Sequence, residues 1–409
     1  MANNIDKYGV LFIAEPDYSS PYYQQVLDNF DCKFFNFEES KVSRTNANYN
    51  TDTNTNGGKI VSFIEFIKKN FKHNVNPLIA IYCGYQAFYP INKLPNELLI
   101  KDEDVNSTPN ILADLKLLVF CSKGVNSVDT EWIKTHRPDL KIVNFDHDAI
   151  ANDVADCCLW HVLESFRKFS YQQSILLQGF DTIETRSIVR DGYTTANNID
   201  TKNFAFGHEL PQGIKIESPS GKKVLVLGFG RIGKKVCQKL KFGLDMKVFY
   251  STRSNKKYDQ LPYECYPWEN ILEPDESLNQ FNCIVICLPG TSTTKNLINN
   301  KFLQKFKDLS KLSIINLGRG FIVDFPGITF QDGATLISKL RSFGTDVYYD
   351  EPNTEREICF KNKENDNSMD KNSLLLSHGS FTPHIASSTD TVYQYSSEHS
   401  LKEILSLMP

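Results

Sequence analysis

Three side chains late in the chain have the types needed to bind an acid and to move a proton. Arg319 stands in NLGRG after the apolar segment SIINL, Glu351 in DVYYDEP after a second apolar segment, and His384 in TPHIASST. A histidine exchanges protons near neutral pH, a carboxylate can orient it, and a guanidinium binds a carboxylate through two parallel hydrogen bonds. With a hydride donor, this set predicts reduction of a 2-oxo acid. Taken singly, each residue also fits a structural role, as a satisfied histidine, a surface charge or a helix cap.

A site for the hydride donor is predicted in VLVLGFGRIGKKVCQKL, where Gly228, Gly230 and Gly233 form the pattern G-x-G-x-x-G. The pattern follows an apolar strand segment and opens a predicted helix, which is the context of a dinucleotide site. The first glycine permits a tight turn, the second lets backbone approach a pyrophosphate, and the third lets helix and strand pack closely. We expect the phosphates at the positive end of the helix. The alternative is a structural glycine turn.

The second strand of this fold ends without the acid that would bind the ribose hydroxyls of NAD. The segment KVFYSTRSNKK places Thr252, Arg253 and Ser254 there instead, followed by Lys256 and Lys257. A guanidinium grips a 2′-phosphate through two hydrogen bonds, and the hydroxyls and lysines add donors and charge. NADP(H) is therefore the expected cofactor and NAD(H) a possible one. The alternative is a solvated basic loop whose arginine points to water.

These motifs stand at the ends of apolar segments that alternate with helical ones in two series. The first series has the predicted strands YGVLFIAEP, PLIAIYC, LKLLVFC and KIVNF, and the second has KKVLVLG, MKVFYS, CIVICLP, SIINLG and FGTDVYY. Predicted helices include SFIEFIKKNF, a long amphipathic helix over residues 153–169 and a final helix over residues 390–408. The alternation predicts an α/β protein with two doubly wound, parallel-sheet domains. Ligands of such sheets bind at the carboxyl ends of the strands.

Two polar stretches interrupt the series. Residues 44–58, RTNANYNTDTNTNGG, and residues 361–373, KNKENDNSMDKNS, contain almost no apolar side chains. Such segments cannot bury enough surface to offset the entropy lost on ordering. We expect both to be disordered or flexible insertions.

Composition excludes several classes of partner. The net charge of −4 and pI near 6.1 give no reason to bind nucleic acid, and no apolar run approaches the roughly 20 residues of a membrane span. The ten cysteines include no C-x-x-C pair, so we expect no metal site and reduced thiols. A cytoplasmic protein whose partners are small molecules or proteins is expected.

The order of the motifs gives a more specific prediction. From residue 115 to residue 389 the chain has LKLLVFCSKGVNSVD, NDVADCCLWHVLESFRK, GFGRIG, LPGTSTTKNLIN, NLGRGFIVD, DVYYDEP and FTPHIASST in succession. This series resembles the D-isomer-specific 2-hydroxyacid dehydrogenase family, with the glyoxylate/hydroxypyruvate reductases as the nearest branch. Asn126 and Asp156 depart from that family's usual Asp and Glu.

The resemblance implies roles for the residues already singled out. His384 donates the proton to the substrate carbonyl, Glu351 pairs with it, and Arg319 binds the substrate carboxylate. Backbone N–H groups in a loop of the first domain hold the other carboxylate oxygen, which implies a substrate site at Ser122, Lys123 and Gly124.

The resemblance also implies further cofactor contacts. The backbone of Arg231 and Ile232 meets the pyrophosphate. The cofactor is lined by Leu288, Pro289 and Thr294. The nicotinamide carboxamide is received by the carbonyl of Leu317 and the side chain of Asp346.

The architecture that the resemblance implies is a Rossmann coenzyme domain inserted into a flavodoxin-like substrate domain. Residues 1–170 with 385–409 form the substrate domain, and residues 171–384 form the NAD(P)-binding domain. Hinges are expected at residues 170–178 and just after His384. Homodimers formed through the coenzyme domains are a further expectation.

Two other functions use the same fold. A dinucleotide-sensing scaffold, similar to the C-terminal-binding-protein corepressors, keeps much of the same triad without a need for turnover. A formate dehydrogenase pairs its histidine with Gln, so Glu351 disfavours that alternative.

Overall fold

The chain folds into two compact units. A computed structural model describes residues 7–37, 53–85, 87–101, 111–179, 181–191, 210, 215–330, 334–351, 353–354, 357 and 377–408. The first unit comprises Met1–His147 and Thr389–Pro409, and the second comprises Asp148–Ser388. The chain thus leaves the first unit once and returns to it, as expected for an inserted domain.

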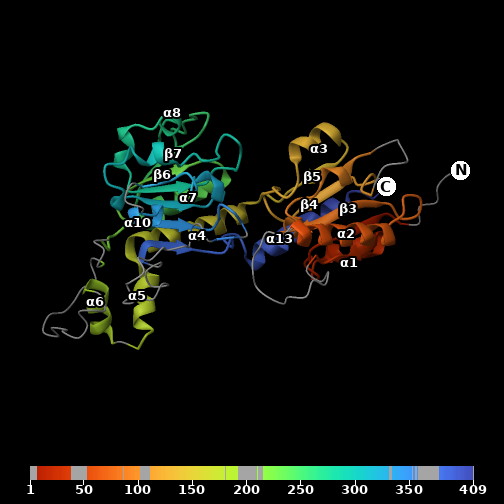
Figure 1. Ribbon diagram of the computed structural model, residues 1–409, viewed down its shortest axis with the longest axis horizontal. Coiled ribbons are helices and arrows are strands. Elements are labelled where there is room, and N and C mark those ends of the chain that lie inside the picture. Colours follow the sequence, from red (N-terminus) through yellow and green to blue (C-terminus); the bar gives the residue numbers. More distant parts are fainter. Residues whose placement is uncertain are drawn as a thin grey trace. The chain divides into compact units, whose positions relative to one another are not determined.

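The first unit contains a five-stranded parallel sheet in the order β2-β1-β3-β4-β5 (Figure 1). Its strands are β1 (Gly9–Phe12), β2 (Asp31–Phe34), β3 (Leu78–Gly84), β4 (Leu117–Phe120) and β5 (Lys141–Val143). Its helices are α1 (Pro21–Asn29), α2 (Thr53–Asn70), α3 (Thr130–His136) and α13 (Asp390–Leu405). The strand order is that of flavodoxin-like folds, as predicted.

The central strands of the first unit are apolar runs because helices cover both faces of the sheet. Every residue of β3 is buried. Leu11 and Ile81 pack on one face with Phe63 of α2, whereas Val10 packs on the other face with Leu401 of α13. Alternate residues of a strand point to opposite faces, so both faces need apolar side chains.

The second unit contains a seven-stranded parallel sheet in the order β12-β11-β10-β9-β6-β7-β8. Its strands are β6 (Lys223–Leu227), β7 (Lys247–Ser251), β8 (Glu264–Cys265), β9 (Cys283–Ile286), β10 (Ser313–Asn316), β11 (Ser342–Thr345) and β12 (Gly379–Phe381). Its helices are α4 (Asp148–Arg167), α5 (Phe169–Leu176), α6 (Thr182–Asp191), α7 (Arg231–Leu244), α8 (Glu269–Leu272), α9 (Asn300–Leu303) and α10 (Leu336–Lys339). The order reverses between β6 and β9, which is the ligand-binding switch point of a Rossmann fold.

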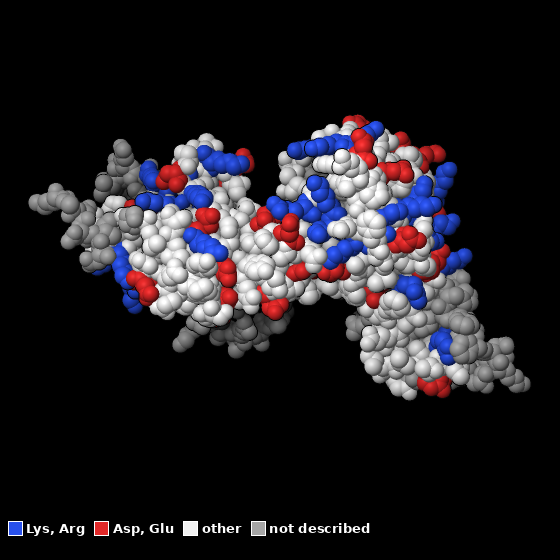
Figure 2. Space-filling model, turned by 180° about the vertical axis from the view of Figure 1, so that it is seen from behind, with Lys and Arg blue, Asp and Glu red and all other residues white. Residues whose placement is uncertain are grey.

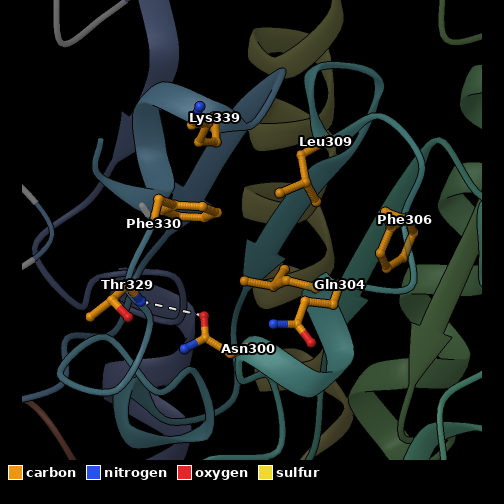
Figure 3. A pocket seen from close by; sticks show the side chains of 8 residues that line it. Asn300, Gln304, Phe306, Leu309, Thr329, Phe330 and Lys339 are labelled. Carbon is orange, nitrogen blue, oxygen red and sulfur yellow. Dashed lines mark hydrogen bonds between the residues drawn. The ribbon is translucent and has the colours of Figure 1, made fainter. Parts of the chain in front are cut away.

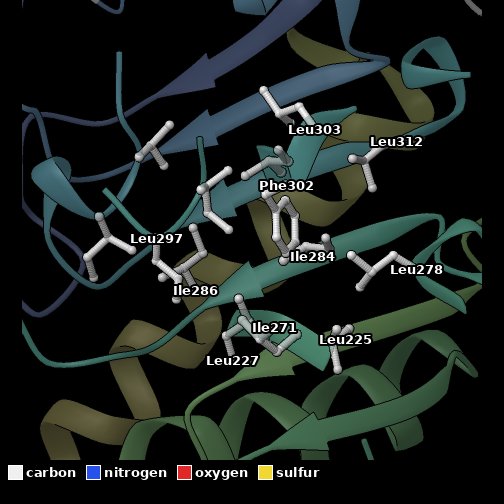
Figure 4. Close-up of a cluster of buried hydrophobic side chains, with 14 of the residues drawn as sticks. Leu225, Leu227, Ile271, Leu278, Ile284, Ile286, Leu297, Phe302, Leu303 and Leu312 are labelled. Atoms are coloured by element: carbon white, nitrogen blue, oxygen red, sulfur yellow. The ribbon is translucent and has the colours of Figure 1, made fainter. Parts of the chain in front are cut away.

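A large apolar cluster fills one face of this second sheet (Figure 4). Leu225 and Leu227 of β6 lie beside Ile284 and Ile286 of β9, and Phe302 of α9 packs over them. Helices α4 and α7 pack against each other, and α4 also contacts β10, β11 and β12. The core fixes the strand ends that carry the predicted motifs.

Several elements differ from the sequence predictions. Strands β2, β8 and β12 were not predicted, because each is at most four residues long or carries few apolar residues. Helix α2 begins at Thr53, so the last part of the insertion predicted over residues 44–58 is helical. The rest of that insertion, and the one over residues 361–373, lie outside the described residues.

The unit boundaries also differ from the predicted domains. The long helix α4 was assigned to the substrate domain, which was predicted to end at residue 170, but it belongs to the second unit. The reason is packing, since α4 lies against α7 and three strands of the second sheet. Most of the hinge predicted over residues 170–178 is α5, whose Tyr171 and Ile175 are buried against Ile188 of α6. The chain crosses between units at residues 147–148 and 388–389.

Charged side chains are mixed over the surface that Figure 2 shows. Lys and Arg are interspersed with Asp and Glu on both units and do not form a single basic stripe on that face. Such a stripe is the usual footprint of nucleic-acid binding. None of the helices in the described ranges has the length and hydropathy to cross a membrane.

Candidate active site

The glycine turn between β6 and α7 has the geometry of a dinucleotide site. Gly228 has a φ of +98°, and a Cβ there would lie 2.8 Å from the carbonyl oxygen of Cys287. A Cβ at Gly233 would lie 1.9 Å from the carbonyl oxygen of Gly228, which confirms the close packing of helix and turn. A Cβ at Gly230 would meet nothing within 4 Å. The space before α7 is therefore open.

The start of α7 offers donors to that open space. Arg231 and Ile232 are the first residues of the helix, where backbone N–H groups have no partner within the helix. The positive end of the helix dipole favours an anion at this point. Arg231 is held by an ion pair of 3.0 Å between its Nη1 and Oδ1 of Asp148. Open space, N–H donors and a helix of fourteen residues together fit a pyrophosphate.

The loop after β7 carries the residues predicted to select the cofactor. Thr252 is partly buried and accepts a hydrogen bond of 3.1 Å from the Lys256 N–H, whereas Arg253 and Ser254 are exposed. Within the described ranges the guanidinium of Arg253 has no ion pair or hydrogen bond. The side-chain amide of Asn255 donates hydrogen bonds of 2.7 and 2.8 Å to the two carboxylate oxygens of the nearby Glu269. The exposed Arg253 and Ser254 and the partly buried Thr252 hydroxyl thus stand together at this strand end.

The remaining predicted cofactor residues lie at the ends of β9, β10 and β11. Leu288 is buried, and Thr294 closes the following loop by donating 2.7 Å to the carbonyl of Pro289. Leu317 follows β10, and its N–H donates to the carbonyl of Ile286 at 3.0 Å. Asp346 follows β11 and is 3% exposed. All of them belong to the second unit.

His384 and Glu351 form the central pair of the site. Nδ1 of His384 lies 3.0 Å from Oε2 of Glu351, and Oε1 of Glu351 accepts 2.8 Å from the Tyr348 N–H. The side chain of His384 is 49% exposed, so it remains accessible to a ligand. Because Nδ1 faces the carboxylate, Nε2 is the nitrogen left for a ligand.

Arg319 lies close enough for its charge to act on both members of this pair. It follows β10, and Asn316 fixes its backbone through a bond of 2.9 Å to its carbonyl. A Cβ on the next residue, Gly320, would lie 1.9 Å from the carbonyl carbon of Tyr348. Only a glycine lets the segment before Glu351 pass this closely. The sheet edge and this contact bring the three predicted residues together.

The charges of the pair support each other. The hydrogen bond that His384 donates to Glu351 raises the pKa of His384 above its ordinary 6.5, although burial opposes the shift. Burial works against the charged form of Glu351, yet the hydrogen bond and charge of His384, the Tyr348 N–H and Arg319 hold its pKa below 4.5. The arrangement therefore favours an imidazolium beside a carboxylate.

Asp346 has contacts that the sequence pattern did not predict. Its Oδ1 accepts 2.6 Å from the Thr382 hydroxyl and 2.8 Å from the Ile385 N–H, and its Oδ2 accepts 3.0 Å from the Ala386 N–H. Burial raises the pKa of Asp346 despite these bonds. A carboxylate oxygen has two lone pairs, so Oδ2 retains capacity for a further donor such as a carboxamide.

The predicted substrate loop lies in the first unit, after β4. The Ser122 hydroxyl donates 2.7 Å to the Gly124 carbonyl, and the Asn144 side chain donates 2.6 Å to the Lys123 carbonyl. Both bonds shape the loop through its carbonyls. In the part of the chain that the structure describes, the N–H groups of Lys123 and Gly124 donate to no other protein group.

Comparison with known proteins identifies the family. Residues 186–386 match the model of the NAD binding domain of D-isomer specific 2-hydroxyacid dehydrogenases. The Saccharomyces cerevisiae protein named "Putative 2-hydroxyacid dehydrogenase YGL185C" is 32% identical over 97% of this chain and 92% of its own length. This chain belongs to the D-isomer specific 2-hydroxyacid dehydrogenase family. The predicted family is thus confirmed, and the glycine turn lies in a nicotinamide dinucleotide-binding domain.

Other relatives of this dehydrogenase support the fold and the class of enzyme. Glyoxylate reductase 1 of S. cerevisiae is 25% identical over 58% of this chain and 57% of its own length. A glyoxylate reductase structure from Paecilomyes thermophila matches with a TM-score of 0.63 at 18% identity, covering 98% of this chain and 95% of the other. The dehydrogenase is therefore an NAD(P)-dependent oxidoreductase with the predicted α/β fold.

One surface pocket of the dehydrogenase lies outside the predicted site (Figure 3). It has a volume of about 480 Å³, and the ring of Phe330 and the side chain of Lys339 lie on one side of it. Its lining is Asn300, Leu303, Gln304, Phe306, Leu309, Thr329, Phe330 and Lys339. None of these residues belongs to a predicted motif, and no described contact assigns the pocket a ligand.

Two residues with close links to the site were missed by sequence reasoning. Thr382 precedes the Pro-His motif and binds Asp346, and His161 lies on α4 within hydrogen-bond distance of Thr382. A polar residue in the buried stripe of a predicted amphipathic helix is the signal that would have marked His161.

Proposed function

We propose that this dehydrogenase reduces a 2-oxo acid with NAD(P)H, with His384 as the proton donor, Glu351 as its partner and Arg319 as the substrate-binding cation. The observation that carries the proposal is the 3.0 Å pair between Nδ1 of His384 and Glu351. A carboxylate on Nδ1 fixes the ring and keeps it protonated, which a general acid needs.

The substrate carboxylate has two candidate sets of donors. Arg319 provides a guanidinium next to the pair, and a guanidinium binds a carboxylate in a fixed orientation. The backbone N–H groups of Lys123 and Gly124 are the second set, and their lack of acceptors within the described ranges supports this role. Binding at Arg319 also draws electron density from the adjacent carbonyl.

The proton moves from Nε2 of His384 to the carbonyl oxygen of the substrate, and the hydroxyl of the 2-hydroxy acid forms. The ring becomes neutral, while Glu351 still accepts the Nδ1–H. When bound, the reduced nicotinamide supplies the hydride that the carbonyl carbon accepts. Leu317 and Asp346 would hold the carboxamide through the Leu317 carbonyl and the remaining capacity of Oδ2. The product predicted by the family is the D-isomer.

We further propose that NADP(H) is preferred over NAD(H). The exposed Arg253, with the hydroxyls of Thr252 and Ser254, supports binding of a 2′-phosphate. A solved relative from Sinorhizobium meliloti is described as an NADPH-dependent glyoxylate/hydroxypyruvate reductase in complex with NADP and malonate; it is 18% identical, with a TM-score of 0.60. The printed names of the relatives make glyoxylate and hydroxypyruvate the first substrates to test.

A panel of 2-oxo acids with NADPH and with NADH tests the proposal. We expect loss of absorbance at the nicotinamide band with at least one acid, and a decrease in kcat of roughly 100-fold or more in His384→Ala. His73→Ala is the matched control, because His73 also pairs with a carboxylate, Asp114, but lies on the surface of the first unit. The control variant should keep the wild-type rate.

The alternative to turnover is a scaffold that senses the dinucleotide. NADPH binding without oxidation by any acid of the panel, measured by fluorescence of the bound cofactor, would support the scaffold and contradict the reductase. An unchanged rate in His384→Ala would contradict the assignment of the acid.

We also propose a homodimer that forms through the second unit. Helix α5, the residue that follows it and helix α6 carry exposed apolar side chains, namely Phe169 (45% exposed), Leu177 (76% exposed) and Ile183 (36% exposed), which a second copy would cover. Sedimentation equilibrium at micromolar concentration tests this, and a monomer would contradict it.

A further inference from the structure

A histidine is completely buried behind the site, where an apolar residue would be expected. His161 of α4 is 0% exposed, and its ring packs against β11, where a Cβ on Gly344 would lie 3.1 Å from Nδ1. Burying a polar ring is unfavourable unless its nitrogens are hydrogen-bonded. Both nitrogens have partners on the segment that leads to His384. Nδ1 lies 2.7 Å from the Ser380 hydroxyl, and Nε2 lies 3.4 Å from the Thr382 hydroxyl.

The direction of these bonds follows from the groups at each end. Thr382 lies 2.6 Å from Oδ1 of Asp346, which also accepts backbone N–H groups and so acts as a carboxylate; Thr382 must donate to it. The hydroxyl oxygen of Thr382 is then free to accept from Nε2–H of His161. Burial lowers the pKa of His161 to about 3, so the ring is neutral and Nδ1 accepts from Ser380. The result is one directed chain from His161 through Thr382 to Asp346, and Ser380 satisfies the other nitrogen of His161.

Asp346 connects this chain of hydrogen bonds to the residues before and after His384, the proposed proton donor. It binds Thr382 before His384, and the N–H groups of Ile385 and Ala386 after it. His384 itself has a φ of +56°, a conformation that a residue with a side chain rarely adopts. Such a conformation persists only where the surroundings impose it. The bonds to Asp346 are among the contacts that hold the backbone on either side of His384.

We propose that His161 is a positioning residue, which through Thr382 and Asp346 holds the loop of His384 in the geometry needed for proton transfer. The inference rests on the proposed role of His384 as the acid. His161 touches neither substrate nor cofactor in this proposal. It orients the Thr382 hydroxyl toward Asp346, and an unoriented hydroxyl would leave Asp346 free to turn away from the Ile385 N–H.

The surroundings of Thr382 provide the controls. The backbone carbonyl of Thr382 accepts a hydrogen bond of 2.9 Å from the Tyr348 hydroxyl. Sγ of Cys157 lies 3.9 Å from the Thr382 hydroxyl oxygen, which is too far for a strong bond. Ser380 binds the other nitrogen of His161 but has no bond to Asp346 in the described part of the chain. Loss of the Ser380 hydroxyl therefore removes a hydrogen-bond partner of the buried His161 ring but leaves the hydrogen bond between Thr382 and Asp346 in place.

The test compares His161→Leu, Thr382→Val and Ser380→Ala for kcat, KM and thermal stability, at a temperature where each variant is folded. We expect kcat to fall roughly 10- to 100-fold in His161→Leu and Thr382→Val, because a displacement of about 1 Å has that effect on a reacting group. Ser380→Ala should lose stability but keep kcat within about twofold. The double variant that combines His161→Leu with Thr382→Val should be no slower than Thr382→Val alone, since both substitutions break the same chain.

Conservative variants keep the test decisive if His161→Leu does not fold. Thr382→Ser and His161→Gln retain a hydroxyl and an N–H donor at the required places, and both should recover most of the rate. A readout independent of turnover is hydrogen exchange of the Ile385 and Ala386 amides, measured by mass spectrometry. Exchange should quicken in Thr382→Val and His161→Leu, and stay at the wild-type rate in Ser380→Ala.

The outcomes separate this inference from the proposed function. Loss of rate in His384→Ala together with wild-type kcat and exchange in His161→Leu would overturn the positioning role alone. Additive effects in the double variant would do the same. An unchanged rate in His384→Ala would overturn the proposed function and the catalytic meaning of the chain, while amide exchange would still test the chain itself.

Discussion

At the scale of single residues, the property that matters most is the charge shared between His384 and Glu351. The acid must be an imidazolium before it can donate, so reduction is lost as pH rises through the raised pKa of His384. The same shift stabilises the folded chain. That contribution is fully present below the unfolded pKa of about 6.5 and disappears as pH rises through the folded pKa.

Replacement of Glu351 with Gln should therefore move the alkaline limit of activity to lower pH. Gln keeps a hydrogen-bond partner for His384 but removes the negative charge that favours the imidazolium. We expect kcat at neutral pH to fall about tenfold or more. A pH profile of kcat/KM for the wild type and the variant measures the shift. An unchanged alkaline limit would show that another group sets it.

Replacement of Arg253 with Ala should discriminate between the cofactors. The guanidinium is exposed and has no protein partner within the described ranges, so its removal should leave the fold intact. We expect KM for NADPH to rise about tenfold or more, since a charge-assisted bond to phosphate contributes roughly 1.5–3 kcal/mol. KM for NADH should stay within about twofold. Equal losses for both cofactors would show that Arg253 does not bind the 2′-phosphate.

At the scale of elements, a buried arginine ties α3 of the first unit to the chain before β4. Arg137 is 1% exposed and follows α3 directly. Its Nη1 donates 2.7 Å to the Leu99 carbonyl, and its Nη2 donates 2.7 Å to the Leu115 carbonyl and also bonds Asp139. Among the described residues no backbone N–H of a loop or turn donates to these two carbonyls, so the guanidinium serves as their donor.

Replacement of Arg137 with Leu should destabilise the first unit by roughly 3 kcal/mol or more, because several buried carbonyls lose their donor at once. Urea unfolding followed by circular dichroism measures this change. Lys134→Ala on the same helix is the matched control. The Lys134 pair with Glu131 is exposed on both sides, at 70% and 82%, so its loss should cost under about 1 kcal/mol. Similar effects of the two substitutions would contradict the structural role of Arg137.

At the scale of the whole molecule, the two units have separate apolar cores. The cluster that includes Leu225 and Phe302 belongs to the second unit, and the clusters that include Phe63 and Leu401 belong to the first. The glycine turn and the predicted cofactor residues are all in the second unit. A bound cofactor should therefore stabilise one core more than the other.

Calorimetry should show two unfolding transitions, and NADPH should raise the midpoint temperature of only one of them. At a cofactor concentration of about 100 times Kd, we expect that transition to rise by roughly 5–10 °C. Arg137→Leu should lower the other transition and leave the cofactor-sensitive one in place. A single transition that moves as a whole in both experiments would contradict independent unfolding of the units.

The sequence by itself determined the fold class and the family, and it predicted the residues of the central triad. Gly228, Arg319 and Glu351 each come after a predicted apolar strand, and parallel strands present their carboxyl ends at one edge of the sheet. Local pattern and strand order therefore suffice to predict that such residues meet. Short elements such as β8 and β12 escaped prediction because pairing with a neighbouring strand stabilises them, and few residues carry the signal.

The tertiary structure alone decided which unit α4 belongs to and which side chains form hydrogen bonds next to His384. Helix α4 belongs to the second unit because of the surface on which it packs, and no local signal in residues 148–167 encodes that choice. His161 and Ser380 are 219 positions apart, and Thr382 and Asp346 are 36 apart. Hydrogen bonds depend on distances and angles between side chains, which separation along the chain does not fix. The chain of bonds behind His384 therefore became visible only when helix and strands were packed together.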